Sequence, residues 1–100
     1  MKKIEAIIRP FVLTDVRKAL EVLDVQEITT FEAMMYPFQN SYKEQHRGAS
    51  YEMDFLPMIK VEIVADENRV EAIIEAIGVA AAMNQAGGGK VDVLNIERVV

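Results

Sequence analysis

A chain of 100 residues, 51% of them hydrophobic, fits one domain over residues 1–100 with a single, modest core. Sixteen acidic residues against eleven basic ones, a net charge of -5, argue against a nucleic-acid partner. The absence of cysteine excludes disulfides, thiolate metal sites and thiol nucleophiles. The first ten residues carry charges within an apolar run that is too short for a signal peptide or a membrane span, so we expect a cytoplasmic protein with no direct membrane insertion.

The first half of the chain predicts a strand, a helix and a second strand. Lys3–Ile8 is rich in β-branched residues and is followed by Pro10, which discourages a central strand from continuing. Thr14 can cap a helix that ends near Asp24, with apolar residues at helical spacing. Residues 25–35, rich in Thr, Ile and Phe, favour a second strand.

After a long polar excursion, the second half repeats this order. Met58–Ala65 alternates charged and apolar residues and gives the clearest strand signal in the chain. Asp66 can cap a second helix that runs from about Glu67. The glycines of residues 86–90 indicate a turn, and Val91–Ile96 is expected to form the last strand.

The order strand, helix, strand, strand, helix, strand predicts an α+β, ferredoxin-like fold with a four-stranded antiparallel sheet. A long loop joins its second and third strands. Two short helices can cover one face of such a sheet, so the second face, expected to be rich in Ile, Val and Thr, needs another cover. Self-association is the simplest one.

Three segments of the chain carry a recognisable pattern: the opening residues 1–11, the loop motif Arg47-Gly48-Ala49-Ser50-Tyr51 and the return strand that begins at Asp54. All three resemble the corresponding segments of the PII family of nitrogen-regulatory signal-transduction proteins. The similarity keeps one register from Met1 to Val100. It implies a non-enzymatic homotrimer that binds adenine nucleotides between subunits. It also implies a T-loop, here about residues 36–54, that docks onto a target protein such as a transporter or a metabolic enzyme.

The resemblance carries over a set of nucleotide-binding residues: Thr29, Glu62, Val64, Gly87, Gly88, Gly89 and Lys90. In the family, the acid of a Gly-Asp-Gly-Lys turn stands where this chain has Gly88. Glycines let backbone amides approach an anion, and a lysine supplies the compensating charge. The same glycines also fit a plain turn between helix and strand, and Thr29, Glu62 and Val64 would each fit a strand without any ligand.

Other family positions have changed. Met35-Tyr36-Pro37-Phe38 stands where the family has Gly-Phe-Gly-Arg, so proline and aromatic residues replace flexible backbone and a phosphate-binding arginine. The sequence ends at Val100, before two further family arginines that reach the phosphates. Met58 replaces the lysine that pairs with 2-oxoglutarate and cannot neutralise a carboxylate. These changes lead us to expect ADP or AMP as the effector rather than ATP with 2-oxoglutarate, and no permanent cofactor.

The resemblance assigns partner contact to five residues of the T-loop: Gln39, Tyr42, His46, Arg47 and Tyr51. Tyr51 matches a position that is uridylylated in many bacterial members, but a solvated loop tyrosine is the simpler interpretation. Gln39 helps to hold magnesium in the family, and here it is equally well a solvated residue. His46 beside Glu44 is weak support for a metal site, and we expect none.

Met34, Met35, Tyr36 and Phe38 form an apolar cluster before the excursion. It can be core at the end of a strand or an adaptable contact surface.

Besides the effector-binding regulator, two alternatives remain open. One is an adaptor that has lost nucleotide binding and acts by protein contact alone. The other, less favoured, is an acylphosphatase-like hydrolase that uses Arg9 for phosphate and Asn40 for water, although no nucleophile and base pair is apparent.

Overall fold

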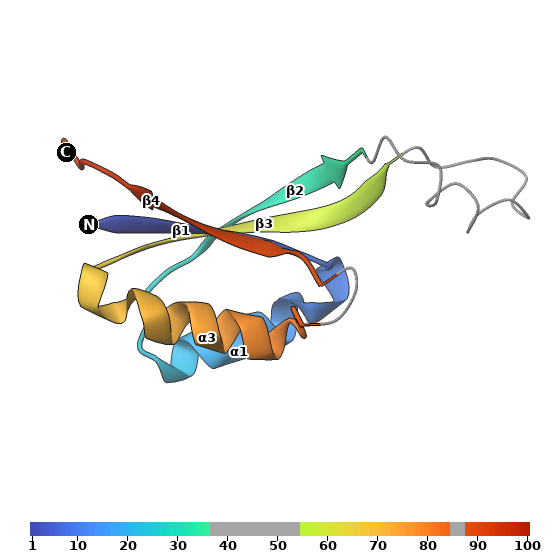
Figure 1. Ribbon diagram of the computed structural model, residues 1–100, viewed down its shortest axis with the longest axis horizontal. Coiled ribbons are helices and arrows are strands. Elements are labelled where there is room, and N and C mark those ends of the chain that lie inside the picture. The colour runs from blue at the N-terminus through green and yellow to red at the C-terminus, as the bar shows by residue number, and fades with distance from the viewer. Residues whose placement is uncertain (37–54, 85–87) are drawn as a thin grey trace, which may run out of the picture.

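The computed structural model describes residues 1–36, 55–84 and 88–100 of the chain. The elements are β1 (Lys2–Ile8), α1 (Leu13–Val22), β2 (Thr29–Met35), β3 (Leu56–Ala65), α3 (Val70–Ala80) and β4 (Lys90–Asn95), in the predicted order (Figure 1). Neighbouring strands are antiparallel, and their order across the sheet is β2-β3-β1-β4. The predicted α+β, ferredoxin-like fold is therefore confirmed.

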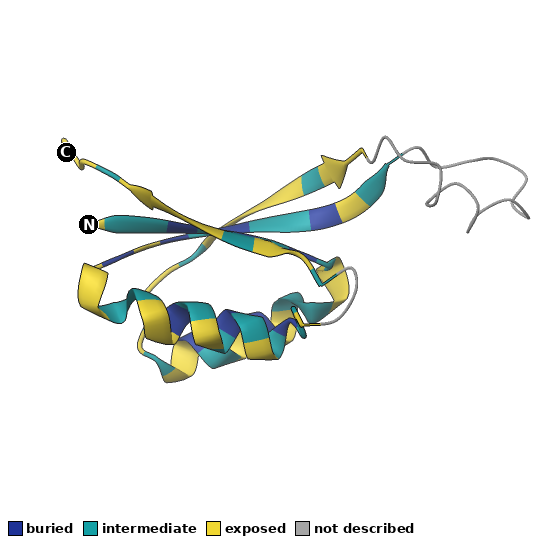
Figure 2. Ribbon diagram, viewed as in Figure 1, coloured by how far each residue is buried: buried dark blue, intermediate teal, exposed yellow. Residues whose placement is uncertain are grey.

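The core lies between one face of the sheet and the two helices, which pack side by side beneath it (Figures 1 and 2). Alternate residues of β1 and β3 point into this layer, as the period-two pattern of the third strand predicted. Its buried members are all aliphatic: Ile4, Ala6, Ile8, Val16, Leu20, Val61, Ile63, Ala65, Ile73, Ile77 and Ala81. Each fully buried Leu, Ile or Val side chain stabilises the fold by about 1.5–3 kcal/mol.

A turn led by proline, rather than a side-chain cap, starts the first helix. Pro10 opens the 3-10 turn Pro10–Val12, where its missing N–H is not needed and its fixed φ suits a helical turn. α1 follows at Leu13, with Val12 as N-cap residue and no side-chain cap. The prediction that Thr14 caps this helix is wrong, because Thr14 already lies inside it.

The second helical segment begins at the predicted place by a similar route. Asp66 is extended and precedes the 3-10 turn Glu67–Arg69, but its side chain makes no capping hydrogen bond. Its carbonyl instead accepts the backbone N–H of Arg69 at 3.0 Å, and α3 then begins at Val70. The position of Asp66 was predicted correctly, and its role as a side-chain cap was not.

The second strand starts four residues later than the predicted Val25. The N–H of Val25 donates to the carbonyl of Leu20 at 3.1 Å, and Asp24 adopts a left-handed φ of 60° to complete the exit from α1. Val25 and Ile28 pack against the core from this connection. These two apolar side chains therefore contribute to the core although their backbone is not part of a strand.

The third and fourth strands both begin earlier than predicted. β3 includes Pro57, because its pairing with β1 starts only at Ile59 and leaves Pro57 with a neighbour on the β2 side alone. Proline is tolerated at such an edge. Lys90, which was expected in the turn, already belongs to β4 and lies opposite Ile7.

The second face of the sheet carries no helix in the described part of the chain (Figure 1). The expectation that it is rich in Ile, Val and Thr is correct for its periphery, where Ile7, Thr29 and Val64 lie. It is wrong for the centre. There β1 and β3 place four charged side chains: Lys3, Glu5, Lys60 and Glu62.

Candidate functional site

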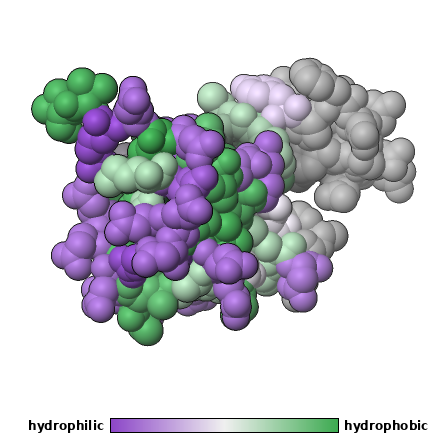
Figure 3. Space-filling model, turned by 60° about the vertical axis from the view of Figure 1, so that its left-hand side comes forward, coloured by the Kyte–Doolittle hydropathy of each residue, from purple (hydrophilic) through white to green (hydrophobic). Residues whose placement is uncertain are grey.

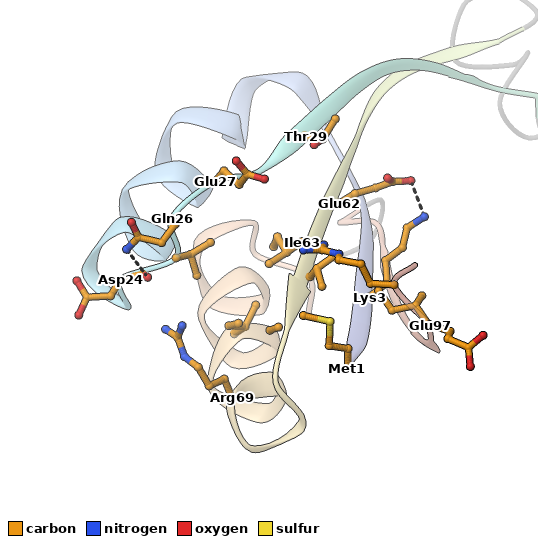
Figure 4. A pocket seen from close by; sticks show the side chains of 16 residues that line it. Met1, Lys3, Asp24, Gln26, Glu27, Thr29, Glu62, Ile63, Arg69 and Glu97 are labelled. Atoms are coloured by element: carbon orange, nitrogen blue, oxygen red, sulfur yellow. Dashed lines mark hydrogen bonds and ion pairs between the residues drawn. The ribbon is translucent and has the colours of Figure 1, made fainter. Parts of the chain in front are cut away.

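Three of the predicted nucleotide-binding residues, Thr29, Glu62 and Val64, line one cleft (Figure 4). The cleft lies at the end of the sheet where both chain termini are found and has a volume of about 610 Å³. Residues 24–27, residues 96–98 and the start of the second helical segment complete its walls. The structure thus brings these three predicted residues together.

The cleft exists because β2 stops pairing before β3 ends. Thr29, the first residue of β2, lies opposite Glu62, so Ile63–Ala65 have no partner on that side. The preceding connection turns away toward the helices, where Val25 packs on the core. The space between this connection and the free edge of β3 becomes the cleft.

Polar contacts hold the walls of the cleft in place. The side chain of Gln26 donates from Nε2 to the carbonyl of Asp24 at 3.2 Å. The guanidinium of Arg69 donates to the carbonyl of Leu23, which joins the end of α1 to the start of α3. Lys3 reaches across from β1 to Glu62, with Nζ and Oε2 3.4 Å apart (Figure 4). The walls of the cleft therefore carry hydrogen-bond acceptors and positively charged side chains, and these contacts fix the walls in position.

Glu62 is also part of a closed group of four charges on the second sheet face, which we call the charge square (Lys3, Glu5, Lys60 and Glu62). The Nζ–Oε2 distance from Lys60 is 3.0 Å to Glu62 and 3.7 Å to Glu5. Lys3 lies 3.4 Å from each carboxylate. The hydrogen bond with Lys60 lowers the pKa of Glu62, and the same bond raises the pKa of Lys60 against the opposing effect of desolvation. Glu62 therefore stays ionised at neutral pH.

The glycine turn lies elsewhere, at the start of β4. Gly89 has a φ of +107°, and a Cβ at this position would lie 1.9 Å from the carbonyl oxygen of Ile7. The fold itself therefore requires glycine here, with or without a ligand. Gly88 is half-buried, Lys90 is exposed, and Gly87 falls outside the described residues.

The two groups of predicted nucleotide residues do not meet within one chain. Thr29 lies on β2 and Lys90 on β4, the opposite edges of the sheet, with β3 and β1 between them. Three interstrand spacings separate them, roughly 14 Å. Lys90 and Gly89 contribute nothing to the cleft walls.

Sequence reasoning missed the charge square and the cleft-wall residue Arg69. A usable signal existed for the square, since the pattern Lys-x-Glu occurs in both central strands, at residues 3–5 and 60–62. Its meaning depends on register, because Glu5 lies opposite Glu62 only in the folded sheet. Nothing comparable marks Arg69, whose partner is a backbone carbonyl 46 residues away.

The changed family positions fall into two environments. Met58 is only 2% exposed, so its side chain is part of the packed structure. Met34, Met35 and Tyr36 are instead 41–60% exposed, which favours the contact-surface interpretation of this cluster over a core. The ring of Tyr36 packs against Phe55 with centroids 5.7 Å apart, and its hydroxyl donates to the sulfur of Met34 at 3.6 Å. Figure 3 shows apolar and polar side chains intermixed on the side of the molecule that it presents.

Several predicted residues lie outside the described part of the chain: Phe38, Gln39, Asn40, Tyr42, His46, Arg47 and Tyr51. Among the residues that are described, no three acidic or histidine side chains are grouped as a metal site requires. Arg9, the phosphate residue of the hydrolase alternative, lies with its guanidinium carbon 5.5 Å from the centroid of the Phe11 ring. Within residues 1–36, 55–84 and 88–100, no helix is long and apolar enough to cross a membrane.

Comparison with known proteins agrees with this architecture. A family model described as nitrogen regulatory protein P-II matches residues 1–100. Proteins of that name from Rhizobium meliloti (strain 1021), Mesorhizobium japonicum and Azospirillum brasilense are 48%, 49% and 46% identical. Each match covers 100% of this chain and 89% of the relative. The chain therefore belongs to the P-II family of nitrogen regulatory proteins, which are signal transducers rather than enzymes.

Proposed function

We propose that the chain is a homotrimeric cytoplasmic regulator that binds an adenine nucleotide between its subunits and controls a target protein through the T-loop, residues 36–54. The observation that carries this proposal is the position of the candidate ligand residues toward opposite sides of one sheet. Thr29 lies on the edge strand β2 with Glu62 opposite it on β3, and Gly89 and Lys90 lie at the other edge, at the start of β4.

A ring of identical chains joins these two edges. When each copy sets its β2 edge beside the β4 edge of the next, the cleft at Thr29 faces a neighbour's Lys90. Such head-to-tail contacts form closed rings when the rotation between copies closes. In this arrangement the cleft supplies polar contacts to a nucleoside, and Lys90 with its glycine turn supplies charge to the phosphates.

The uncovered sheet face supports the same arrangement. Phe31, Val64 and Leu94 are 36–46% exposed on this face. An apolar periphery of this kind, with no helix over it in the described chain, gains stability when copies cover it.

The exchanged residues favour a nucleotide with few phosphates. Met58 is packed where the family has the lysine that pairs with an oxo-acid, and a thioether offers no charge to a carboxylate. At the entrance to the T-loop, Met35 and Pro37 stand where the family has flexible glycines, and Tyr36 packs on Phe55. We therefore propose ADP or AMP as the effector, without 2-oxoglutarate.

Calorimetric titration with ATP, ADP and AMP tests the effector. Binding of ADP or AMP is expected, and Lys90→Ala should weaken it by about 1.5–3 kcal/mol, tenfold or more, because a charge-assisted contact is lost. Lys18→Ala, an exposed change on α1, is the matched control and should bind as the unmodified chain does. Absence of heat with all three nucleotides contradicts the proposal.

The exposed cluster of Met34, Met35 and Tyr36 favours one alternative, an adaptor that acts by protein contact alone. Thioether and aromatic side chains adapt to varied partners, and these three lie at the end of β2 that leads into the T-loop. Capture of a target that is unchanged by ADP, and lost in Met34→Glu, supports the adaptor. Capture that depends on nucleotide supports the sensor.

A further inference from the structure

β2 and β3 extend beyond the rest of the sheet as a two-stranded ribbon. β3 pairs with β1 only from Ile59 onward, whereas its pairing with β2 continues to Leu56, which lies opposite Met35. Figure 1 shows this ribbon leading away from the helices. The described residues at its outer end therefore pair with one neighbouring strand only.

The methionines of the described chain differ widely in their access to solvent. Met34, on this ribbon, is 60% exposed, compared with 54% for Met1 and 41% for Met35. Met58 is only 2% exposed, and Met83 packs against the core. Oxidation of a thioether requires that the oxidant reach the sulfur. Among the described methionines, Met34 is therefore the one that a dissolved oxidant reaches most easily.

Strand alternation places Met34 and Met35 on different faces of the ribbon. Phe31 lies on the uncovered face, because Lys60 of the charge square is opposite it and directs its ammonium group to the ring. Side chains alternate along a strand, so Met35 shares the face of Phe31 and Met34 lies on the other. Copies of the chain that cover the uncovered face therefore leave Met34 accessible.

The sulfur of Met34 already has a hydrogen-bond donor beside it. Tyr36 follows two residues later on the same side of the strand, and its hydroxyl donates to Sδ at 3.6 Å. The ring of Tyr36 packs against Phe55, with centroids 5.7 Å apart and the ring planes tilted by 42°. A thioether is a weak acceptor. A stronger acceptor at the same place would therefore hold the Tyr36 hydroxyl more firmly.

We propose that Met34 is a modification site for hydrogen peroxide and that its sulfoxide binds the Tyr36 hydroxyl. A lone pair of Sδ attacks one peroxide oxygen, so that the O–O bond breaks and an S–O bond forms. The sulfur is oxidised by two electrons and the peroxide is reduced. The departing hydroxide takes the proton of the transferred oxygen and leaves as water. The sulfoxide oxygen carries partial negative charge and lies within reach of the donor that the thioether already had.

Oxidation changes the outer end of the ribbon in two ways. The most exposed apolar side chain of the cluster Met34, Met35 and Tyr36 becomes polar, and Tyr36 is held by a stronger bond. Both changes act where the chain enters the T-loop. Their consequence for a target rests on the function proposed above, whereas the oxidation itself does not. Enzymatic reduction of the sulfoxide restores the original surface.

Peptide mass spectrometry after brief exposure of the folded chain to dilute hydrogen peroxide tests the site. Met34 should gain one oxygen about tenfold or more faster than Met58, whose side chain is only 2% exposed. Far-ultraviolet circular dichroism of the same samples measures whether the fold is kept. Equal rates at the two residues in the folded chain, or no reaction at Met34, overturn the proposal.

Carbon-13 NMR of the tyrosine Cζ atoms tests the new hydrogen bond, because Cζ carries the hydroxyl and its resonance responds to the acceptor. The chain has three tyrosines, and Tyr36→Phe identifies the Tyr36 resonance by removing it. Peroxide should shift this resonance in the unmodified chain. It should not do so in Met34→Leu, which keeps an apolar side chain of similar volume that peroxide does not oxidise. Met35→Leu is the matched control and should keep the shift.

Two results of the NMR experiment contradict the proposal. One is a Tyr36 resonance that stays in place while Met34 is fully oxidised, and the other is an equal shift in Met34→Leu. Neither measurement involves a nucleotide, a target or the number of associated chains. A negative result therefore leaves the proposed regulator intact, and a failure of nucleotide binding leaves the Met34 site intact.

Discussion

At the scale of single residues, two glycines have opposite roles. Gly89 has a φ of +107° and faces the carbonyl of Ile7, whereas Gly78 lies inside α3, where an added Cβ would have no neighbour within 4 Å. Gly89→Ala should therefore destabilise the fold by about 2 kcal/mol or more, from the left-handed backbone and the displaced strand end. Gly78→Ala, the matched control, should stabilise it by about 0.5–1 kcal/mol through helix propensity. Urea denaturation measures both, and equal effects would contradict the assigned roles.

The charge square gives the unfolding equilibrium a predictable pH dependence. The lowered pKa of Glu62 means that its contribution is present above its ordinary value of 4.5 and is lost as the pH falls below that value. The raised pKa of Lys60 means that its contribution is present below 10.5 and is lost as the pH rises above that value. The free energy of unfolding should fall at both extremes, and Lys60→Met/Glu62→Gln should weaken both slopes. Unchanged slopes in the double variant would refute the assignment.

At the scale of elements, Arg69 joins the two helices. Its guanidinium donates to the carbonyl of Leu23, at the end of α1, from the turn that starts α3. Arg69→Met keeps the length of the side chain and removes the donor, so we expect a loss of about 1.5–3 kcal/mol in unfolding free energy. Arg17→Met, at an exposed position on α1, should change it by less than about 0.5 kcal/mol. Equal results for the two variants would show that the link is unimportant.

The order of the helices and strands was predictable from hydrophobic periodicity. The residues at which they begin and end were less predictable. Alternation placed Val61 and Ile63 correctly, because a central strand with one covered face must alternate. The prediction that Thr14 caps the first helix was wrong. Thr is a frequent N-cap residue, but here the chain enters the helix through the turn that Pro10 opens. The prediction that the second strand starts at Val25 was wrong, because apolar side chains of a connection can pack on the core without forming strand pairs.

The cleft was only partly predictable for a similar reason. Thr29, Glu62 and Val64 were identified by resemblance, and the structure places them on one cleft. The contribution of Lys3 depends on strand register and on a side chain that reaches from β1 to β3. Register is a property of the folded sheet, so single-strand patterns do not reveal it.

At the scale of the whole molecule, the described residues form one sheet with a face covered by helices, a face without a helix over it, and the two edge strands β2 and β4. The helices occupy the first face, and the charge square with its apolar periphery occupies the second. One group of candidate ligand residues lies on the edge strand β2 (Thr29) and the neighbouring β3 (Glu62 and Val64), and the other lies at the start of the edge strand β4 (Gly89 and Lys90). The proposed ring of copies would bring the two groups of candidate ligand residues together.

Native mass spectrometry in the presence of ADP tests this account most directly, since it reports the number of chains and of bound nucleotides in one spectrum. The account predicts a species of three times the 11.3 kDa chain that takes up ADP to a limit of one molecule per chain. Lys90→Ala should keep the trimeric mass and lose the nucleotide. A monomer that binds ADP by itself, or a trimer that binds none, would contradict a nucleotide site formed between copies.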